Sequence, residues 1–147
     1  MLKESLLSLY RWLRIHTYRR VFGSIREREG SLSATEAFSA DVIHLLDTPT
    51  LKQFADCIGI SQPNATYKVN MLVEKGYVKK LTPSSDRREI KLEMAEKFHR
   101  YYDDNSPEMA AAVERLQSQF TNEEILLADR VLSALLHNLE EEEKKNA

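Results

Sequence analysis

The segment from Ser61 to Lys75 carries side chains that can bind both the bases and the phosphates of DNA. Asn and Gln pair with adenine in the major groove, and Thr, Tyr and Lys reach phosphate oxygens. The candidate contacts are Gln62, Asn64, Thr66, Tyr67, Lys68 and Asn70. At helical spacing, the opposite, inward face is formed by Ala65, Val69, Leu72 and Val73. An ordinary surface helix has the same polar outer face, so this segment alone does not decide between the two interpretations.

A second basic cluster lies at the predicted tip of a β-hairpin. Arg87 and Arg88 directly follow Asp86, and Lys79 and Lys80 lie on the incoming strand. Arginine at a loop tip fits the narrow, negative minor groove of A·T-rich DNA. Asp86 is then structural, because its carboxylate can hydrogen-bond the turn and hold an arginine in place. A charged turn that pairs with itself is the alternative, but beside the polar helix the cluster favours a DNA interface.

No spacing in the chain is typical of a metal site, a catalytic centre or a cofactor site. The histidines lie too far apart in sequence to form a zinc motif with one another or with the cysteine: His16, His44, His99 and His137. Nucleophile elbows, phosphate-binding loops and paired carboxylates are also missing from the sequence. Cys57 is expected to be a buried, inert thiol, with a redox sensor as the alternative. The sequence therefore predicts a protein that is not an enzyme, without metal or cofactor.

A ligand cleft is a further hypothesis. The residues that could line it, between the first helix and the DNA-binding unit, are Trp12, His16, Phe38 and Tyr101. Aromatic residues at helical spacing are also typical of a core, which is the alternative interpretation. A small-molecule effector would bind in this cleft.

Long amphipathic helices are predicted at both ends of the chain. Residues 2–28 place leucines at spacings of three and four, and Gly30 is expected to end this helix. Helix resumes near Ala95, and the run from Asp103 to Pro107 should interrupt it. The last helix, 122–143, begins at a capping box formed by Thr121 and Glu124.

The middle of the chain reads as helix, short helix, turn, helix and hairpin. Capping boxes start the first two helices, at Ser33 with Glu36 and at Thr50 with Gln53, and Ser61 caps the third. These helices end near Asp47, at Gly59 and at Gly76. In residues 77–82 and 90–94 the sequence pattern then has a period of two, which predicts two strands joined by a turn at 83–86. This order is a winged helix-turn-helix.

Composition agrees with a small α-rich chain. The sequence has 147 residues with only 4 Gly and 4 Pro, so turns are scarce and one domain is expected. Its single cysteine excludes an internal disulfide, and no uncharged apolar run is long enough for a membrane span. The net charge is −2, but residues 50–100 are basic and residues 101–147 acidic. This division suits a DNA-binding unit beside another element, and a cytoplasmic location is expected.

Residues 32–97 resemble the MarR family of bacterial transcriptional regulators. The matching motifs are Leu51-Lys52-Gln53-Phe54-Ala55, Ile60-Ser61-Gln62-Pro63, Leu72-Val73-Glu74-Lys75-Gly76-Tyr77-Val78 and Asp86-Arg87-Arg88, the last followed at the family's spacing by Leu92-Glu93-Met94-Ala95-Glu96-Lys97. The resemblance implies base contacts at Asn64, Thr66 and Tyr67, and a minor-groove arginine at the wing tip. It also implies an intertwined dimer built by the first and last helices. Departures are Ala95 where a capping Thr is usual, Leu81 where a further arginine is common, and the break at 103–107.

These observations predict a mainly α protein with a small β-hairpin wing. Its winged helix-turn-helix, residues 31–94, is flanked by long dimerisation helices in residues 1–30 and 95–147 within one intertwined domain. The expected function is a homodimeric regulator that binds double-stranded DNA at a pseudo-palindromic operator, represses transcription and is released by a small ligand. One alternative, favoured by the two departures in the wing, is an interaction module that dimerises with a related regulator and binds no DNA. A second alternative is a regulator that has no effector.

Overall fold

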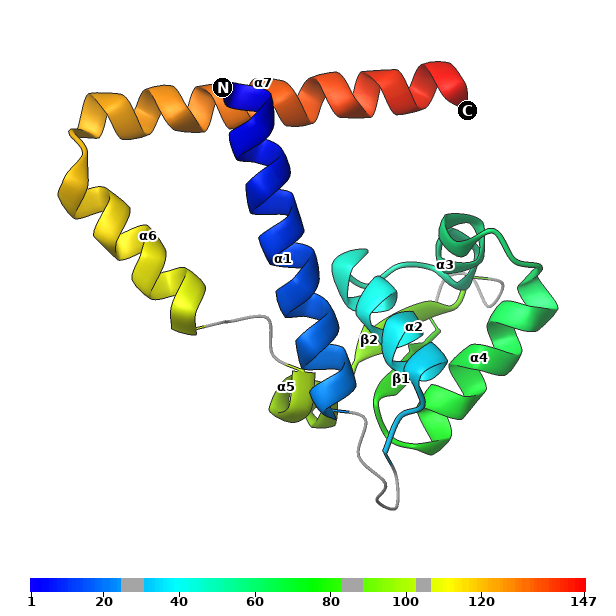
Figure 1. Cartoon of the computed structure of the whole chain (residues 1–147). Helices are drawn as coiled ribbons and strands as arrows, with labels where there is room; N and C mark the ends of the chain where they lie inside the picture. The colour runs from blue at the N-terminus through cyan, green and yellow to red at the C-terminus, as the bar shows by residue number, and fades with distance from the viewer. Residues whose placement is uncertain (25–30, 83–88, 103–106) are drawn as a thin grey trace. The chain divides into compact units, whose positions relative to one another are not determined.

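The computed structural model describes residues 1–24, 31–82, 89–102 and 107–147, which form two compact units, Met1–Asp104 and Asn105–Ala147. Within the first unit, the elements in chain order are α1 (Leu2–Ser24), α2 (Ala34–Leu45), α3 (Leu51–Ile58), α4 (Gln62–Glu74), β1 (Val78–Leu81), β2 (Lys91–Met94) and α5 (Glu96–Tyr102) (Figure 1). The second unit consists of α6 (Pro107–Gln119) and α7 (Asn122–Asn146). This architecture confirms the prediction of a mainly α chain with a small hairpin.

The predicted helix starts are confirmed by reciprocal capping. In α2 the Ser33 hydroxyl accepts a hydrogen bond from the backbone N–H of Glu36, and the Glu36 carboxylate accepts one from the backbone N–H of Ser33. The same box forms in α3 between Thr50 and Gln53, and in α7 at Thr121. Each box satisfies N–H groups that the first helical turn leaves without an intrahelical partner.

Glycines in the left-handed region follow α3 and α4, as the sequence indicates. Gly59 has φ 67° and Gly76 has φ 79°, a conformation that costs glycine little. The end of α2 differs in detail. Because Thr48 precedes a proline, an extended backbone is expected there, but Asp47 and Thr48 have φ 52° and 57°. The helix stops where it was predicted to stop, but the backbone turns through the left-handed region instead.

The hairpin is antiparallel and is joined to the start of α3. Val78 pairs with Met94 and Leu81 with Lys91, while the turn predicted at 83–86 and the wing-tip residues lie outside the described residues. On the other side of β2, the backbone N–H of Leu92 donates to the Pro49 carbonyl at 2.8 Å. These backbone bonds tie the wing to the helix-turn-helix.

The core of the first unit lies between the winged-helix elements, α1 and α5. Its largest fully buried side chains are Tyr77, Phe54, Phe98, Leu32, Ile43, Leu72, Leu92 and Val69. Two expectations about burial are wrong. Val73 is 36% exposed, because it follows Leu72 by about 100° around the helix and lies at the edge of the buried face. Cys57 is exposed, because the buried face of α3 is formed by Phe54 and Ala55.

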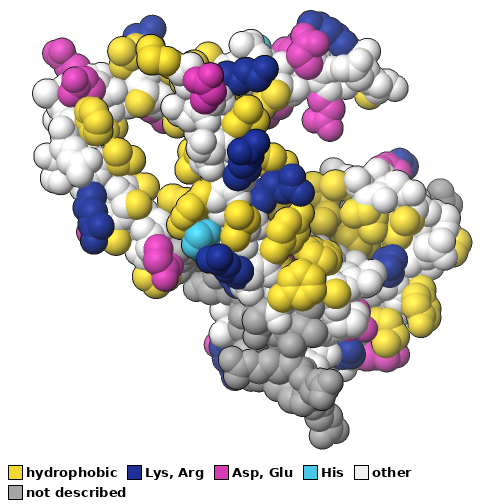
Figure 2. All heavy atoms as spheres, in the orientation of Figure 1, with side chains coloured by type: hydrophobic (Ala, Val, Ile, Leu, Met, Phe, Trp, Pro, Cys, Tyr) yellow, Lys and Arg dark blue, Asp and Glu magenta, His cyan; other side chains and the backbone are white. Residues whose placement is uncertain are grey.

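Apolar side chains remain exposed along the long helices. On α1 they include Leu2, Leu9 and Phe22, at 62%, 50% and 62% exposure, and Figure 2 shows hydrophobic side chains gathered over this helix. The second unit has no buried residue in α6 or α7 as described, although α7 carries many leucines. The break predicted near residues 103–107 falls between α5 and α6, with residues 103–106 outside the described residues. Over the described part of the chain, no helix is long and apolar enough to cross a bilayer.

Candidate nucleic-acid interface

The outer face of α4 presents the predicted base-reading side chains. Ser61 caps the helix by accepting a hydrogen bond from the backbone N–H of Asn64 at 3.3 Å, and Pro63 occupies the first turn, where its missing N–H costs nothing. The exposed candidates are Gln62, Asn64, Tyr67 and Asn70, and the half-buried ones are Thr66 and Lys68. Tyr67 is 68% exposed, which is unusual for a large aromatic residue on a core helix.

The inner face of α4 holds this helix firmly. Ala65, Val69 and Leu72 are each fully buried in the core of the first unit. The exposed polar face therefore stands on a rigid support, as a surface that reads base edges requires.

A side-chain contact links α4 to the hairpin. The ammonium of Lys80, on β1, donates a hydrogen bond to the amide oxygen of Asn70 at 2.5 Å. Lys79, the preceding residue, lies opposite Glu93 in the strand register and is exposed. The structure thus brings together Asn70 and Lys80, which the sequence identified separately. Asp86, Arg87 and Arg88 lie outside the described residues, so their roles stay predictions.

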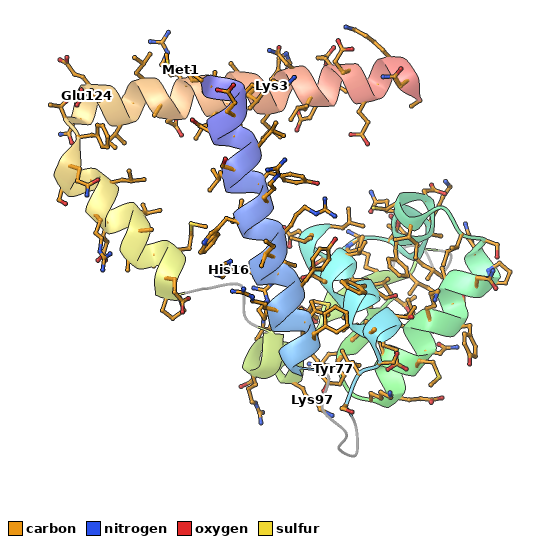
Figure 3. All side chains as sticks on the ribbon, viewed as in Figure 1. Met1, Lys3, His16, Tyr77, Lys97 and Glu124 are labelled. Atoms are coloured by element: carbon orange, nitrogen blue, oxygen red, sulfur yellow. The ribbon has the colours of Figure 1, made fainter. Side chains whose placement is uncertain are left out.

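The C-terminal end of α4 is fixed by a network that sequence reasoning missed. Lys75 donates to the Glu36 carboxylate at 2.7 Å and to the Ser31 carbonyl at 2.9 Å. Lys97 in turn donates to the Lys75 carbonyl at 2.8 Å, and its ammonium lies 4.6 Å from the centre of the Tyr77 ring (Figure 3). The network joins the end of α4 to the start of α2 and to α5.

The Glu36 carboxylate is the titrating group of this network. Burial raises its pKa, but the hydrogen bonds from Lys75 and from the Ser33 backbone, together with the positive charge of Lys75, outweigh burial and hold the pKa below its ordinary value. Glu36 is therefore ionised at neutral pH and neutralised by Lys75.

Of the residues proposed for a ligand cleft, Trp12 and His16 contact each other, and Phe38 contacts Tyr18, which was not among those proposed. The rings of Trp12 and His16 stack with centroids 3.6 Å apart, and Tyr18 meets Phe38 edge to face at 6.2 Å. The side chain of Tyr101 is not among those described. A cleft lined by the predicted residues stays a prediction.

Two histidines far apart in the sequence come together. The rings of His44 and His99 lie 5.7 Å apart, edge to face, beside a hollow also lined by Glu93. Among the residues the structure describes, no group of three or more His, Cys, Asp or Glu could hold a metal ion.

Residues 41–90, which include the end of α2, all of α3 and α4, and β1, match the family model described as MarR family. The winged helix of this chain is similar to that of the MarR family. No match was found among curated protein sequences. The resemblance noted from the motifs is thereby confirmed, and the matched residues hold the exposed face of α4.

Solved structures of MarR-type regulators share the fold over nearly the whole chain. Streptococcus pneumoniae FabT in complex with DNA is similar with a TM-score of 0.63 and 24% identity, over 95% of this chain and 96% of that one. A mutant of S. aureus MepR from a multidrug-resistant clinical isolate gives 0.60 and 14%, over 91% and 96%. Another S. aureus MepR mutant, bound to an oligodeoxyribonucleotide, gives 0.51 and 13%, over 91% and 97%. At these identities the likeness shows a common fold.

Proposed function

We propose that this chain is a homodimeric transcription regulator that binds a pseudo-palindromic operator and represses transcription. The observation that carries the proposal is the exposed polar face of α4, held on a fully buried inner face within a winged helix similar to that of the MarR family. The FabT and MepR structures bound to DNA support it, because they share this fold. Repression is tested by in vitro transcription from a promoter that contains the selected operator.

Base reading is assigned to the first turns of α4. An operator is first selected from random DNA by retention on the wild-type protein, and its two half-sites should lie about 34–36 Å apart, one helical turn. Asn64→Ala should cost on the order of 1–3 kcal/mol at this operator and little on random DNA, measured by fluorescence anisotropy. Equal losses on both DNAs would show that Asn64 does not read bases. A wild-type protein that retains no DNA would favour the non-binding interaction module.

Dimerisation is assigned to α1, α6 and α7. A helix as long as α7 with no buried residue has little to stabilise it in a single chain, because packing of an apolar face supplies most helical stability. Its leucines, with those of α1, fit a second copy of this chain. Deleting residues 1–28 should therefore leave an insoluble or unfolded chain, and a soluble, folded monomer would contradict this assignment.

A point substitution tests the same surface. Leu139, on the apolar face of α7, is 60% exposed in the single chain, and Leu139→Glu should shift the protein toward monomer in light scattering. His137→Glu adds the same charge to the polar face of the same helix and should leave the dimer intact. Dimers of equal stability in both variants would exclude the apolar face of α7 from the interface.

A further inference from the structure

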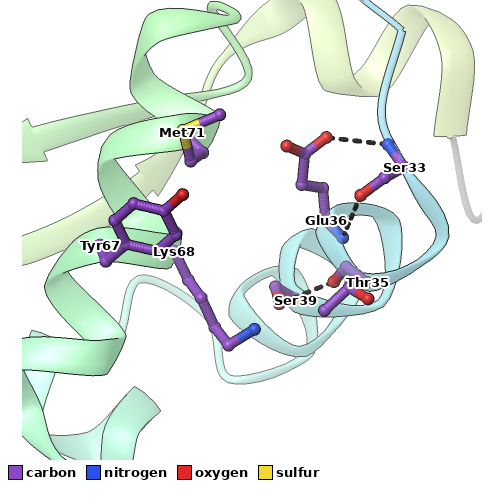
Figure 4. A pocket seen from close by; sticks show the side chains of 7 residues that line it. All are labelled: Ser33, Thr35, Glu36, Ser39, Tyr67, Lys68 and Met71. Atoms are coloured by element: carbon purple, nitrogen blue, oxygen red, sulfur yellow. Dashed lines mark hydrogen bonds between the residues drawn. The ribbon is translucent and has the colours of Figure 1, made fainter.

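A small hollow lies between the start of α2 and the outer side of α4. Thr35, Glu36 and Ser39 line it from α2, and Tyr67 and Lys68 line it from α4 (Figure 4). Its volume is about 180 Å³. This is several times the roughly 30 Å³ that a water molecule occupies in the liquid, but below the 300–1,000 Å³ typical of pockets for drug-sized ligands. The hollow therefore fits a compact group such as a phosphate.

The charge of the hollow is positive. The one carboxylate that lines it belongs to Glu36, which is already engaged by the Lys75 ammonium at 2.7 Å and the Ser33 backbone N–H at 2.8 Å. None of the ion pairs among the residues that the structure describes includes Lys68. Its ammonium thus contributes an unbalanced positive charge, and the hollow favours an anion.

The donors around the hollow are those that hold phosphate oxygens in protein–DNA complexes. Thr35 and Tyr67 are exposed and each carry a hydroxyl, and Lys68 supplies the ammonium. Ser39 lies deeper, and its hydroxyl donates to the Thr35 carbonyl at 2.8 Å, so it shapes the floor of the hollow. One cation and two hydroxyls are too few to hold a free anion tightly. They suffice to bind one DNA phosphate in an interface that contacts several.

We propose that this hollow seats one phosphate of the DNA backbone, and that α2 is therefore part of the DNA interface. The inference rests on the proposed function and extends it to Thr35, on a helix outside the predicted recognition elements. Recognition helices read bases with their N-terminal residues, while neighbouring structure crosses the backbone. Tyr67 and Lys68 lie one turn beyond Asn64, where α4 is expected to pass the phosphates at the edge of the groove.

Thr35→Glu gives the sharpest test, because stability and binding should change in opposite directions. Thr35 is the second residue of α2, and an acidic side chain in the first turn favours the helix dipole. The melting temperature should thus hold or rise, while repulsion of the phosphate should weaken binding at least about tenfold. His137→Glu adds the same charge to the polar face of α7, where it should leave the dimer intact, and serves as the matched control.

Lys68→Ala tests the charge of the seat. It should weaken binding by a similar factor on the operator and on random DNA, because phosphate contacts are independent of sequence. The slope of log K for DNA binding against log salt concentration should become shallower by about 0.9 for each phosphate contact that is lost. Lys3→Ala removes the same charge near the N-terminus of α1, away from α4, and should leave the slope unchanged (Figure 3).

The outcomes separate this inference from the proposed function. If the wild-type protein binds no DNA, the proposed function fails and the inference fails with it. If the wild type binds but Thr35→Glu and Lys68→Ala behave like their controls, the seat is refuted and the function stands. If inorganic phosphate binds the wild type and Lys68→Ala abolishes that binding, while neither substitution changes DNA binding, the hollow is a site for free phosphate and the inference is overturned.

Discussion

Glu36→Gln should destabilise the fold while leaving the cap of α2 in place. The Glu36 carboxylate accepts hydrogen bonds from the backbone N–H of Ser33 at 2.8 Å and from the ammonium of Lys75 at 2.7 Å. Glutamine can keep the first bond, because it serves a capping box as Glu does, but it offers Lys75 only a neutral oxygen. The Lys75 and Glu36 side chains are 27% and 16% exposed, between a surface pair and a buried one. We therefore expect a loss of about 1–2 kcal/mol at neutral pH.

The pH dependence gives this prediction a second signature. Because the pKa of Glu36 is lower in the folded protein than in the unfolded chain, its contribution is fully present above the unfolded value. The contribution is lost as pH falls through the folded pKa, where the carboxylate is protonated. The difference in unfolding free energy between wild type and Glu36→Gln should therefore be largest near neutral pH. It should begin to shrink as the pH falls through the ordinary glutamate pKa of about 4.3 and should close once the pH is below the lower pKa of the folded protein.

Urea unfolding followed by circular dichroism measures both effects, at one fixed protein concentration because the stability of an oligomer depends on it. Glu124→Gln is the matched control, since Glu124 occupies the same capping-box position in α7 and bonds Thr121, with no lysine partner in the described structure. Glu124→Gln should lower the unfolding free energy by less than Glu36→Gln does. If Glu36→Gln costs no more than Glu124→Gln near pH 7, the ion pair with Lys75 does not stabilise the fold, and the reasoning is refuted.

The sequence predicts the features of this fold that depend on neighbours along the chain. A capping box needs residues three apart, so those at Ser33, Thr50 and Thr121 were all predictable, as were the glycines that end α3 and α4. Helical periodicity does not locate the edge of a buried face to within one residue. For this reason it predicted Val73 and Cys57 to be buried, whereas each lies one position beyond the buried face of its helix and is exposed.

Contacts between elements could not be predicted in the same way. Glu36 and Lys75 are 39 positions apart, and each is an ordinary surface residue in its own helix until the fold brings the two helices together. The same holds for the hollow between α2 and α4, because Thr35 carries no local signal that it faces Lys68. The residues that could read bases were predictable from the outer face of one helix. The hollow proposed to seat a phosphate is formed by two helices and was not.

Two further predictions concern the hairpin. Lys80→Ala should change the base preference of the protein as well as its affinity, because Lys80 donates to Asn70 and orients its amide, whereas Lys79→Ala should lower affinity without changing preference. Equal base preferences in the two variants, from selected DNA, would exclude this orienting role. At the wing tip, Arg87→Ala should weaken operator binding most where flanking A·T-rich DNA narrows the minor groove, and should make log K less dependent on log salt by about one unit. Asp86→Ala should weaken binding too, although it removes a negative charge, because the carboxylate is expected to hold the turn and its arginine in place. A pure charge effect has the opposite sign, so tighter binding by Asp86→Ala together with an unchanged Arg87→Ala would show that the wing does not enter the groove.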